Sequence, residues 1–284
     1  MAFLKLVRIQ NLFLIAFCMW GIRIALVPVQ TSVMEHLNFS LFIISTMLIA
    51  GAGNAINDYF DLKADKMNRP NQVVVGKKIK KRWAILIHWG FNSIAIAIAV
   101  HLGLWFQTWF FIGLHLFSIF LLWFYSLYLK KIFFWSNITI SFLTALIPLI
   151  SLYYAKLLNV PLKHNALILL FSIFAFILNW IREIVKDIQD MEGDRLISVR
   201  SMPIVLGKKA TVGVIQLLSI LSLVPYFYLI IFEMYPDNIV FIWVYTIAVI
   251  AGLLAGIISR YTIRFSSLLL KVSMFIGTFS MYLL

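Results

Sequence analysis

The stretch from residue 239 to residue 258 reads IVFIWVYTIAVIAGLLAGII and contains no charged side chain. About 20 apolar residues in a helix are enough to cross the hydrocarbon core of a bilayer, which is roughly 30 Å thick. The whole chain shares this character, since 63% of its 284 residues are hydrophobic and only 12% are charged. Soluble domains have about 45–50% and about 25% of these residues. The composition therefore excludes a soluble fold.

Hydropathy predicts an all-α polytopic membrane protein with nine spans. The apolar segments are hydrophobic all round and do not alternate with polar residues, which excludes an outer-membrane β-barrel. The predicted spans are residues 10–28, 38–57, 83–104, 107–129, 136–155, 165–185, 211–232, 239–258 and 265–284. This pattern leaves two long connections, 58–82 and 186–210, to carry any chemistry.

The basic residues are distributed unevenly among the connections between spans. With the N-terminus in the cytoplasm, all but three of the 24 Lys and Arg lie on the cytoplasmic side, and the exceptions are Arg23, Lys156 and Lys163. The positive-inside rule favours this orientation. We therefore expect a multi-pass protein of the cytoplasmic membrane with a cytoplasmic N-terminus. Its net charge of +13 indicates topology and contact with membrane lipids, and we expect no nucleic-acid partner.

Eight of the eleven Asp and Glu form two clusters at the cytoplasmic ends of the second and sixth spans. The first cluster contains DYFDLKAD (58–65) and the second contains DIQDMEGD (187–194). Both have the spacing D-x-x-D-x-x-x-D, offset by 129 residues, which suggests an internal repeat within a single domain of residues 1–284. The other acids, expected on the outer side, are Glu35, Glu233 and Asp237.

The spacing within each cluster points to a metal. Side chains that are three, four or seven residues apart lie along one side of a helix, and the carboxylates and the amides before them have this spacing. The like charges of the carboxylates then repel one another. Hard divalent cations would relieve this repulsion, and carboxylate and amide oxygens suit Mg²⁺ with phosphate as a further ligand. We expect two Mg²⁺ ions. The candidate ligands are Asn54, Asn57, Asp58, Asp61, Asp65, Asp187, Asp190 and Asp194. Solvated helix ends paired with Lys and Arg would not explain the duplicated spacing.

Basic residues interleave with the acids and fit a substrate with more negative charge than two Mg²⁺ can neutralise, such as a diphosphate. They are Lys63, Lys66, Arg69, Arg182, Lys186 and Arg195. A separate run, KKIKKR (77–82), favours contact with anionic lipid over a direct role with substrate. His88 and His115 lie inside predicted spans, and we expect each to bond to a neighbouring helix rather than to act in catalysis.

These residues together resemble the UbiA-type superfamily of intramembrane prenyltransferases. Residues 54–70, with N-D-x-x-D-x-x-x-D and a trailing Arg-Pro, resemble its first motif, and residues 182–195 resemble its second. Arg8-x-x-Asn11, Tyr125-Ser126 and Leu129-Lys130 also match, so the resemblance covers essentially the whole chain. One departure is NQVVVGK (71–77), which stands where many relatives carry a second Arg-Pro and Pro-Ser-Gly.

The resemblance implies a ring of nine helices around a central cavity, with the active site at the cytoplasmic side. It also implies a prenyl diphosphate donor and an enzyme whose catalytic residues are Asp58, Asp61, Asp187 and Asp190. The residues expected to bind the diphosphate are Arg8, Asn11, Arg69, Tyr125, Lys130, Arg182, Lys186 and Arg195.

The second motif indicates which acceptor to expect. K-D-I-x-D-x-E-G-D (186–194) resembles the branch of the family that transfers geranylgeranyl to geranylgeranylglyceryl phosphate in membrane lipid biosynthesis. An aromatic or quinone precursor is the alternative acceptor, because other branches share part of this pattern. An ion-coupled transporter is a further alternative, although both acidic clusters lie at the membrane interface and transported ions bind near the midplane.

Overall fold

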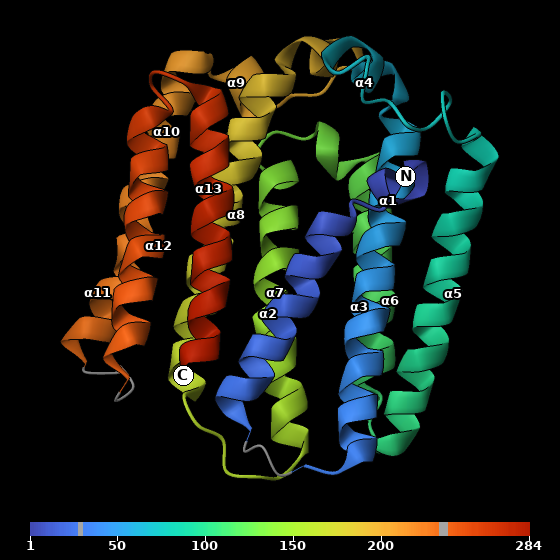
Figure 1. Ribbon diagram of the computed structural model, residues 1–284. Coiled ribbons are helices and arrows are strands. Elements are labelled where there is room, and N and C mark those ends of the chain that lie inside the picture. Colours follow the sequence, from blue (N-terminus) through green and yellow to red (C-terminus); the bar gives the residue numbers. More distant parts are fainter. Residues whose placement is uncertain (28–30, 233–237) are drawn as a thin grey trace. The chain divides into compact units, whose positions relative to one another are not determined.

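The computed structural model describes residues 1–27, 31–232 and 238–284 (Figure 1). Glu233 and Asp237 lie outside these described residues. Most of the described residues are helical. In this part of the chain the β-structure consists of one isolated β-bridge, between Val75 and Ile79, and there is no β-strand. The short helices that flank the spans are α1 (Ala2–Leu6), α4 (Leu62–Asn68), η1 (Leu129–Lys131), α9 (Met202–Val205) and η2 (Met281–Leu283).

Nine segments of the described chain are long and apolar enough to cross a membrane, so the prediction of nine spans is confirmed. Seven are the single helices α2 (Ile9–Leu26), α3 (Val33–Phe60), α5 (Lys81–Trp105), α6 (Phe110–Leu127), α7 (Trp135–Leu157), α8 (Asn165–Leu196) and α12 (Ile239–Ile258). The other two are α10 (Lys208–Leu221) with α11 (Leu223–Ile231), and α13 (Ile263–Ser280) with η2.

Helix α8 is longer than hydropathy predicts. The predicted span ended at residue 185, whereas the helix continues to Leu196. Hydropathy stops where charged residues begin, but Lys, Gln, Glu and Met are good helix formers in water as well as in lipid. The predicted span therefore ended the helix too early, and the second acidic motif lies on a helix, as its spacing indicated.

The seventh span is interrupted at Ser222, between α10 and α11. Proline has no N–H, and its ring clashes with the carbonyl group four residues earlier. For Pro225 that carbonyl belongs to Leu221, the last residue of α10. The helix therefore restarts with Pro225 in the first turn of α11, where proline is tolerated.

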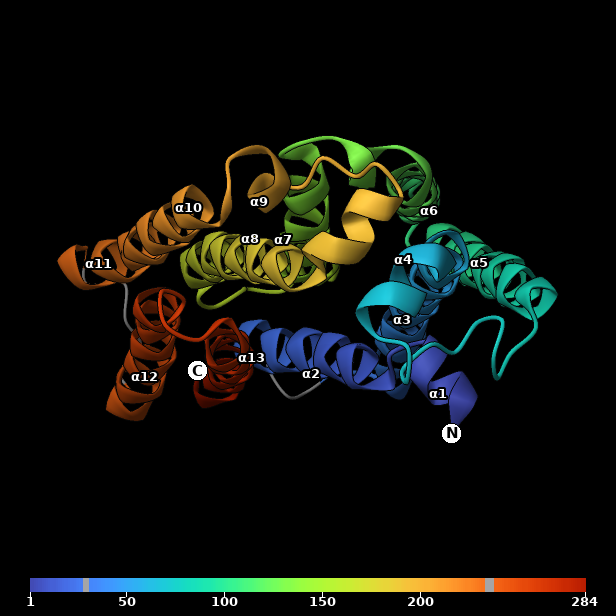
Figure 2. The same cartoon turned by 90° about the horizontal axis from the view of Figure 1, so that it is seen from above.

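The chain divides into two compact units. Unit 1 contains Met1–Ala16, Gln30–Ile132 and Glu192–Val199, and unit 2 contains Phe17–Val29, Phe133–Met191 and Arg200–Leu284. In unit 1, α3 packs against α5 and α6, and α1 and α4 pack on α3 (Figure 1). In unit 2, α12 packs against α13 and α10 (Figure 2). The polar end of unit 1 holds the C-terminal ends of α3 and α6.

Three histidines tie α5 and α6 to one stripe of α3. The stripe residues are seven positions apart, which is about two helical turns. The hydrogen bonds join His101 to Asn38 (3.0 Å), His115 to Ser45 (2.8 Å) and His88 to the carbonyl oxygen of Ala52 (3.1 Å). Such bonds between helices satisfy polar groups that lipid cannot. The expectation that His88 and His115 bond to a neighbouring helix is confirmed.

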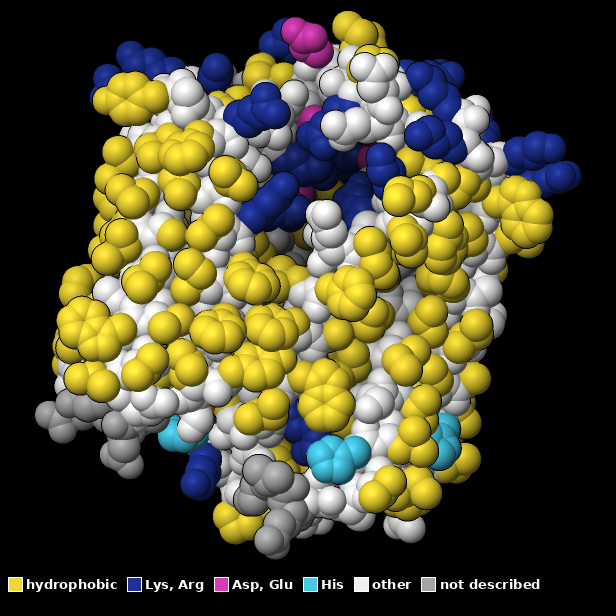
Figure 3. Space-filling view, in the orientation of Figure 1, with side chains coloured by type: hydrophobic (Ala, Val, Ile, Leu, Met, Phe, Trp, Pro, Cys, Tyr) yellow, Lys and Arg dark blue, Asp and Glu magenta, His cyan; other side chains and the backbone are white. Residues whose placement is uncertain are grey.

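Apolar side chains cover the helix flanks. Figure 3 shows them on one face, with Lys and Arg gathered near the helix ends. Leu86 and Trp89 on α5, for example, are 55% and 62% exposed. A soluble protein rarely exposes such continuous apolar surface, so the flanks of these helices are suited to lipid.

Candidate active site

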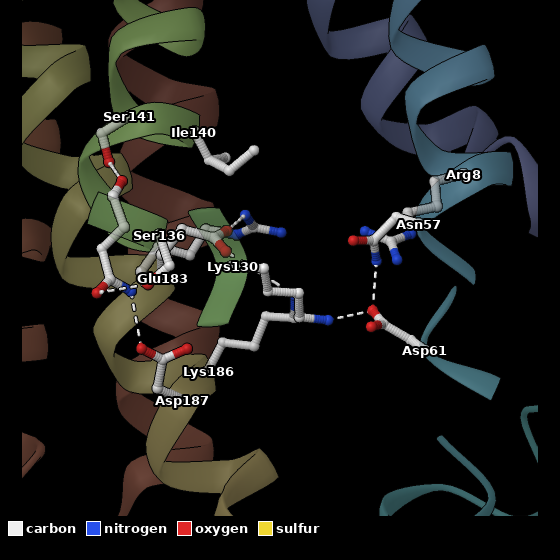
Figure 4. Close-up of polar contacts among 12 residues, drawn as sticks. Arg8, Asn57, Asp61, Lys130, Ser136, Ile140, Ser141, Glu183, Lys186 and Asp187 are labelled. Carbon is white, nitrogen blue, oxygen red and sulfur yellow. Dashed lines mark hydrogen bonds and ion pairs between the residues drawn. The ribbon is translucent and has the colours of Figure 1, made fainter. Parts of the chain in front are cut away.

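Asp61 lies at the joint where α3 ends and α4 begins, and its side chain is almost completely buried. Its carboxylate accepts a hydrogen bond from Asn57 Nδ2 (2.6 Å), one helical turn earlier. The same carboxylate forms an ion pair with Lys130, which η1 presents after the end of α6 (Figure 4). Unit 1 therefore brings the first acidic motif together with a lysine that the resemblance assigned to the diphosphate.

Lys130 lies among several carboxylates. Burial alone lowers the pKa of Lys130, but the charges of Asp61, Asp194 and Asp65 outweigh this effect and raise it, so the ammonium group stays charged. Burial, followed by the charges of Asp61 and Asp58, raises the pKa of Asp65 to about 6. Unit 1 thus gathers carboxylates of both motifs around one lysine.

Val7 and Arg8, in the turn between α1 and α2, bond to residues of the first motif. Arg8 stands between α1 and α2 with a φ of 54°, a left-handed conformation that is uncommon for residues other than glycine. Its guanidinium forms an ion pair with Asp58 (3.0 Å). Asn54 Nδ2 donates to the carbonyl oxygen of Val7 (3.1 Å), so the amide oxygen is the part of Asn54 left to act as a ligand.

The two acidic motifs meet inside unit 1. The backbone N–H of Gly193, in the last turns of α8, donates to Asn68 Oδ1 (2.7 Å) at the end of α4. A Cβ on Gly193 would lie 2.6 Å from the carbonyl oxygen of Ala64, so only glycine allows this approach. The contact places Asp194, which is buried, in the same cluster of charges as Asp61 and Lys130.

Unit 2 holds a second polar cluster, on α7 and α8. Asn137 Nδ2 donates to Asp187 Oδ2 (2.8 Å), and the buried Glu183 pairs with Arg182 (2.8 Å) and Lys186 (3.8 Å). Figure 4 shows Glu183, Lys186 and Asp187 of this cluster. The sequence motifs did not predict a role for Asn137. Its one signal was an amide at the start of an apolar span, where a polar side chain needs a partner.

The remaining predicted residues lie on several different elements. Asn11 is exposed on α2, and Arg195 is exposed near the end of α8. Arg69 is the C-cap of α4, Tyr125 is buried on α6, and Asp190 is half-buried on α8 in unit 2. Their roles in the reaction stay predictions.

The oxygens of the first motif fit a magnesium ion. Asn57 Oδ1 is buried and has no hydrogen-bond partner, beside the carboxylate of Asp61. No three Asp, Glu, His or Cys side chains among the described residues stand close enough to form a complete metal cage. Mg²⁺ does not require one, because it is usually held by one or two carboxylates, water and substrate phosphates.

The nine candidate spans of the described residues, with two acidic motifs at helix ends, define a polytopic membrane protein with a cluster of charged side chains at the ends of its helices. Residues 14–279 match the UbiA prenyltransferase family. The chain therefore belongs to this family, and it is a multi-pass membrane prenyltransferase.

The chain is similar to archaeal digeranylgeranylglyceryl phosphate synthases. It is 36% identical to that of Pyrococcus horikoshii over 176 residues, which cover 62% of this chain and 59% of the relative. It is 32% identical to that of Korarchaeum cryptofilum over 247 residues, covering 83% and 82%. Its fold resembles that of a UbiA homolog from Archaeoglobus fulgidus bound to DMAPP and Mg²⁺, with a TM-score of 0.64, 18% identity and 100% coverage of both chains.

Replacing Gly193 by alanine should disrupt the junction of the two motifs. The added Cβ would press on the carbonyl oxygen of Ala64, and overpacking of this kind costs about 1–3 kcal/mol. We expect a lower melting temperature and at least a tenfold loss of prenyl transfer, measured by thermal unfolding and turnover. Gly213→Ala is the matched control, because no atom lies within 4 Å of a Cβ there. Equal behaviour of the two variants would contradict the tight contact.

Asn137→Ala should weaken the second motif without unfolding the protein. The change removes the N–H that orients Asp187, and loss of a residue that orients a ligand typically costs about 10–100-fold in metal affinity or activity. We expect a loss in that range and a higher Mg²⁺ concentration at half-maximal rate. Thr144→Val is the control, since Thr144 Oγ1 bonds only to the carbonyl oxygen of Ile140 on its own helix. Wild-type activity and Mg²⁺ dependence in Asn137→Ala would refute this role.

Proposed function

We propose that the protein transfers a geranylgeranyl group from its diphosphate to geranylgeranylglyceryl phosphate, with Mg²⁺ as cofactor. The observation that carries this proposal is the convergence of both acidic motifs on Lys130 in unit 1, where the charges of Asp61, Asp65 and Asp194 act on one ammonium group. A site with several carboxylates around a fixed cation suits a ligand composed of a divalent metal and a diphosphate.

The donor end of the proposed site uses the first motif. Asn57, Asp61 and Asp65 would hold one Mg²⁺, and Asp190 and Asp194 the second, with Asn54, Asp58 and Asp187 as further ligands or as supports of the ligands. Magnesium, when bound, would neutralise negative charge on the diphosphate as its bond to the prenyl carbon breaks. Asn57 supports this assignment with its buried, unpartnered amide oxygen.

The cations of the site would bind the leaving diphosphate. Lys130 is the best placed of these in unit 1, because its neighbours keep it charged although it is largely buried. In unit 2, Glu183 holds Arg182 and Lys186 in place on successive turns of α8. Positioned cations of this kind stabilise charge that develops on a leaving group more effectively than mobile surface lysines.

The acceptor would attack through oxygen. In the proposed reaction the free hydroxyl of geranylgeranylglyceryl phosphate forms a C–O bond to the first carbon of the prenyl group, while the bond from that carbon to diphosphate breaks. The hydroxyl proton is released, and the products are the diether and diphosphate. The names of the archaeal relatives support this acceptor.

The orientation proposed for the chain places both motifs in the cytoplasm. All but three of the 24 Lys and Arg then lie on the cytoplasmic side of the membrane, as the positive-inside rule requires. Water-soluble Mg²⁺ and the diphosphate head group of the donor would reach the site from this side.

Asp61→Asn should abolish turnover. The substitution keeps the shape of the side chain but removes the charge that pairs with Lys130, and we expect the rate of prenyl transfer to fall by about 10²–10³-fold. The assay is transfer from labelled geranylgeranyl diphosphate by the purified protein. Glu192→Gln is the control, since Glu192 is an exposed acid of the second motif that is not among the candidate metal ligands. A melting temperature close to wild type separates lost chemistry from lost folding.

The acceptor can be identified directly. Purified protein, labelled geranylgeranyl diphosphate and Mg²⁺ are incubated with geranylgeranylglyceryl phosphate or with an aromatic quinone precursor, and a chelator serves as the metal control. We expect labelled diether only with the glyceryl phosphate and no product after chelation. Labelled aromatic product alone would establish the alternative acceptor, and transfer that survives chelation would exclude Mg²⁺ as the cofactor.

A further inference from the structure

Residues 74–82, here called the basic loop, comprise a turn before α5 and the first two residues of that helix. The N–H of Gly76 donates to the carbonyl oxygen of Ile79 (2.7 Å), and the N–H of Ile79 donates to that of Val74 (3.0 Å). Gly76 has a φ of 79°, which glycine adopts without strain. The loop therefore has a defined backbone, stabilised by its own hydrogen bonds.

The basic loop is anchored in the core of unit 1 by apolar side chains. Val74 and Val75 are 7% and 1% exposed and pack with Leu6, Ala55 and Ala84. These valines belong to the segment 71–77 that departs from the family pattern. The departure thus replaces an expected arginine with an apolar anchor, and the anchor fixes the position of the lysines that follow.

The cations of the basic loop are exposed and unbalanced. Lys78, Lys80, Lys81 and Arg82 are all exposed, and none of the four has an ion pair or side-chain hydrogen bond within the described chain. Lys77 is different, because its Nζ donates to the carbonyl oxygen of Pro70 (2.7 Å). Four neighbouring positive charges repel one another, so an anion from outside the protein would stabilise this surface.

The residues below the basic loop identify the source of that anion. The span formed by α5 begins at Lys81, so the four cations stand at its membrane entrance. Arg82, Leu86 and Trp89 lie at i, i+4 and i+7 on one side of α5, and Leu86 and Trp89 are exposed. Trp83, also exposed, is of the type that favours the membrane interface. A cationic end above an apolar flank matches a lipid with an anionic head and hydrocarbon tails.

We propose that the basic loop and the start of α5 form a binding site for anionic lipids of the bilayer. Lys78, Lys80, Lys81 and Arg82 would contact the head-group phosphate, and the tails would lie along Leu86 and Trp89. The partner is a bulk membrane lipid and not the prenyl donor or acceptor, so the site stands apart from the proposed reaction.

The test compares two short-chain lipids that differ only in head-group charge. Purified full-length protein is mixed with equal amounts of dioctanoyl phosphatidylglycerol and dioctanoyl phosphatidylcholine, and native mass spectrometry counts the molecules bound. We expect wild type to prefer phosphatidylglycerol. The variant K78Q/K80Q/K81Q/R82Q should reduce that preference at least fivefold, the effect of about one cation at an anionic surface.

Matched variants make the result specific. K208Q/K209Q removes two exposed lysines at the start of α10 and should change the preference less than twofold. K78R/K80R/K81R keeps the charge and should keep the preference. If the quadruple variant does not fold, the wild-type preference should still fall sharply between about 50 mM and about 500 mM salt.

Three results would overturn the proposal. The first is an unchanged preference in the folded quadruple variant. The second is an equal loss in K208Q/K209Q, which would mean that any basic helix end suffices. The third is an unchanged lipid preference with a raised KM for prenyl diphosphate, which would assign the basic loop to the substrate. The lipid measurement needs no turnover, so its outcome is independent of the acceptor assay.

Discussion

The buried ammonium group of Lys130 lies within electrostatic reach of three carboxylates, those of Asp61, Asp65 and Asp194. Carboxylates that gather where water is scarce raise the free energy of the charged state. Burial, and then the charges of Asp61 and Asp58, accordingly raise the pKa of Asp65. Under the proposed function, a divalent cation and a diphosphate bring both signs of charge to this site together. The free protein is therefore prepared for the metal–diphosphate pair more than for either component alone.

The contact between Gly193 and α4 determines which carboxylates share this environment. Because the N–H of Gly193 bonds to Asn68 Oδ1, the end of α8 lies against the helix that follows Asp61. The residues around the first motif can pack against α8 in this way only if position 193 of the second motif is glycine. Two segments that look like independent repeats in the sequence depend on each other in the fold.

Hydropathy and motif spacing predicted the nine spans and most of the polar cluster in unit 1, because lipid contact and helical periodicity are local properties of sequence. The extension of α8 to Leu196 was not predictable from hydropathy, since charged helices and charged loops are equally polar. The pairing of Asn137 with Asp187, fifty positions apart, depends on how α7 packs against α8. The ion pair between Asp61 and Lys130 likewise depends on where η1 lies after the end of α6. Contacts of this kind follow from tertiary packing, which a single sequence does not display.

The histidine bonds to Asn38, Ser45 and Ala52 occur at three levels along α3. Sliding α5 or α6 along α3 by a fraction of a turn would break these bonds and leave polar groups facing hydrocarbon, which is expensive. The axial register of the three helices is therefore fixed from within the span. Asp61 directly follows α3, so the depth of its carboxylate relative to the surrounding helices is set by side chains far from the chemistry. A change in bilayer thickness would tilt this group of helices as one body before it displaced the carboxylate.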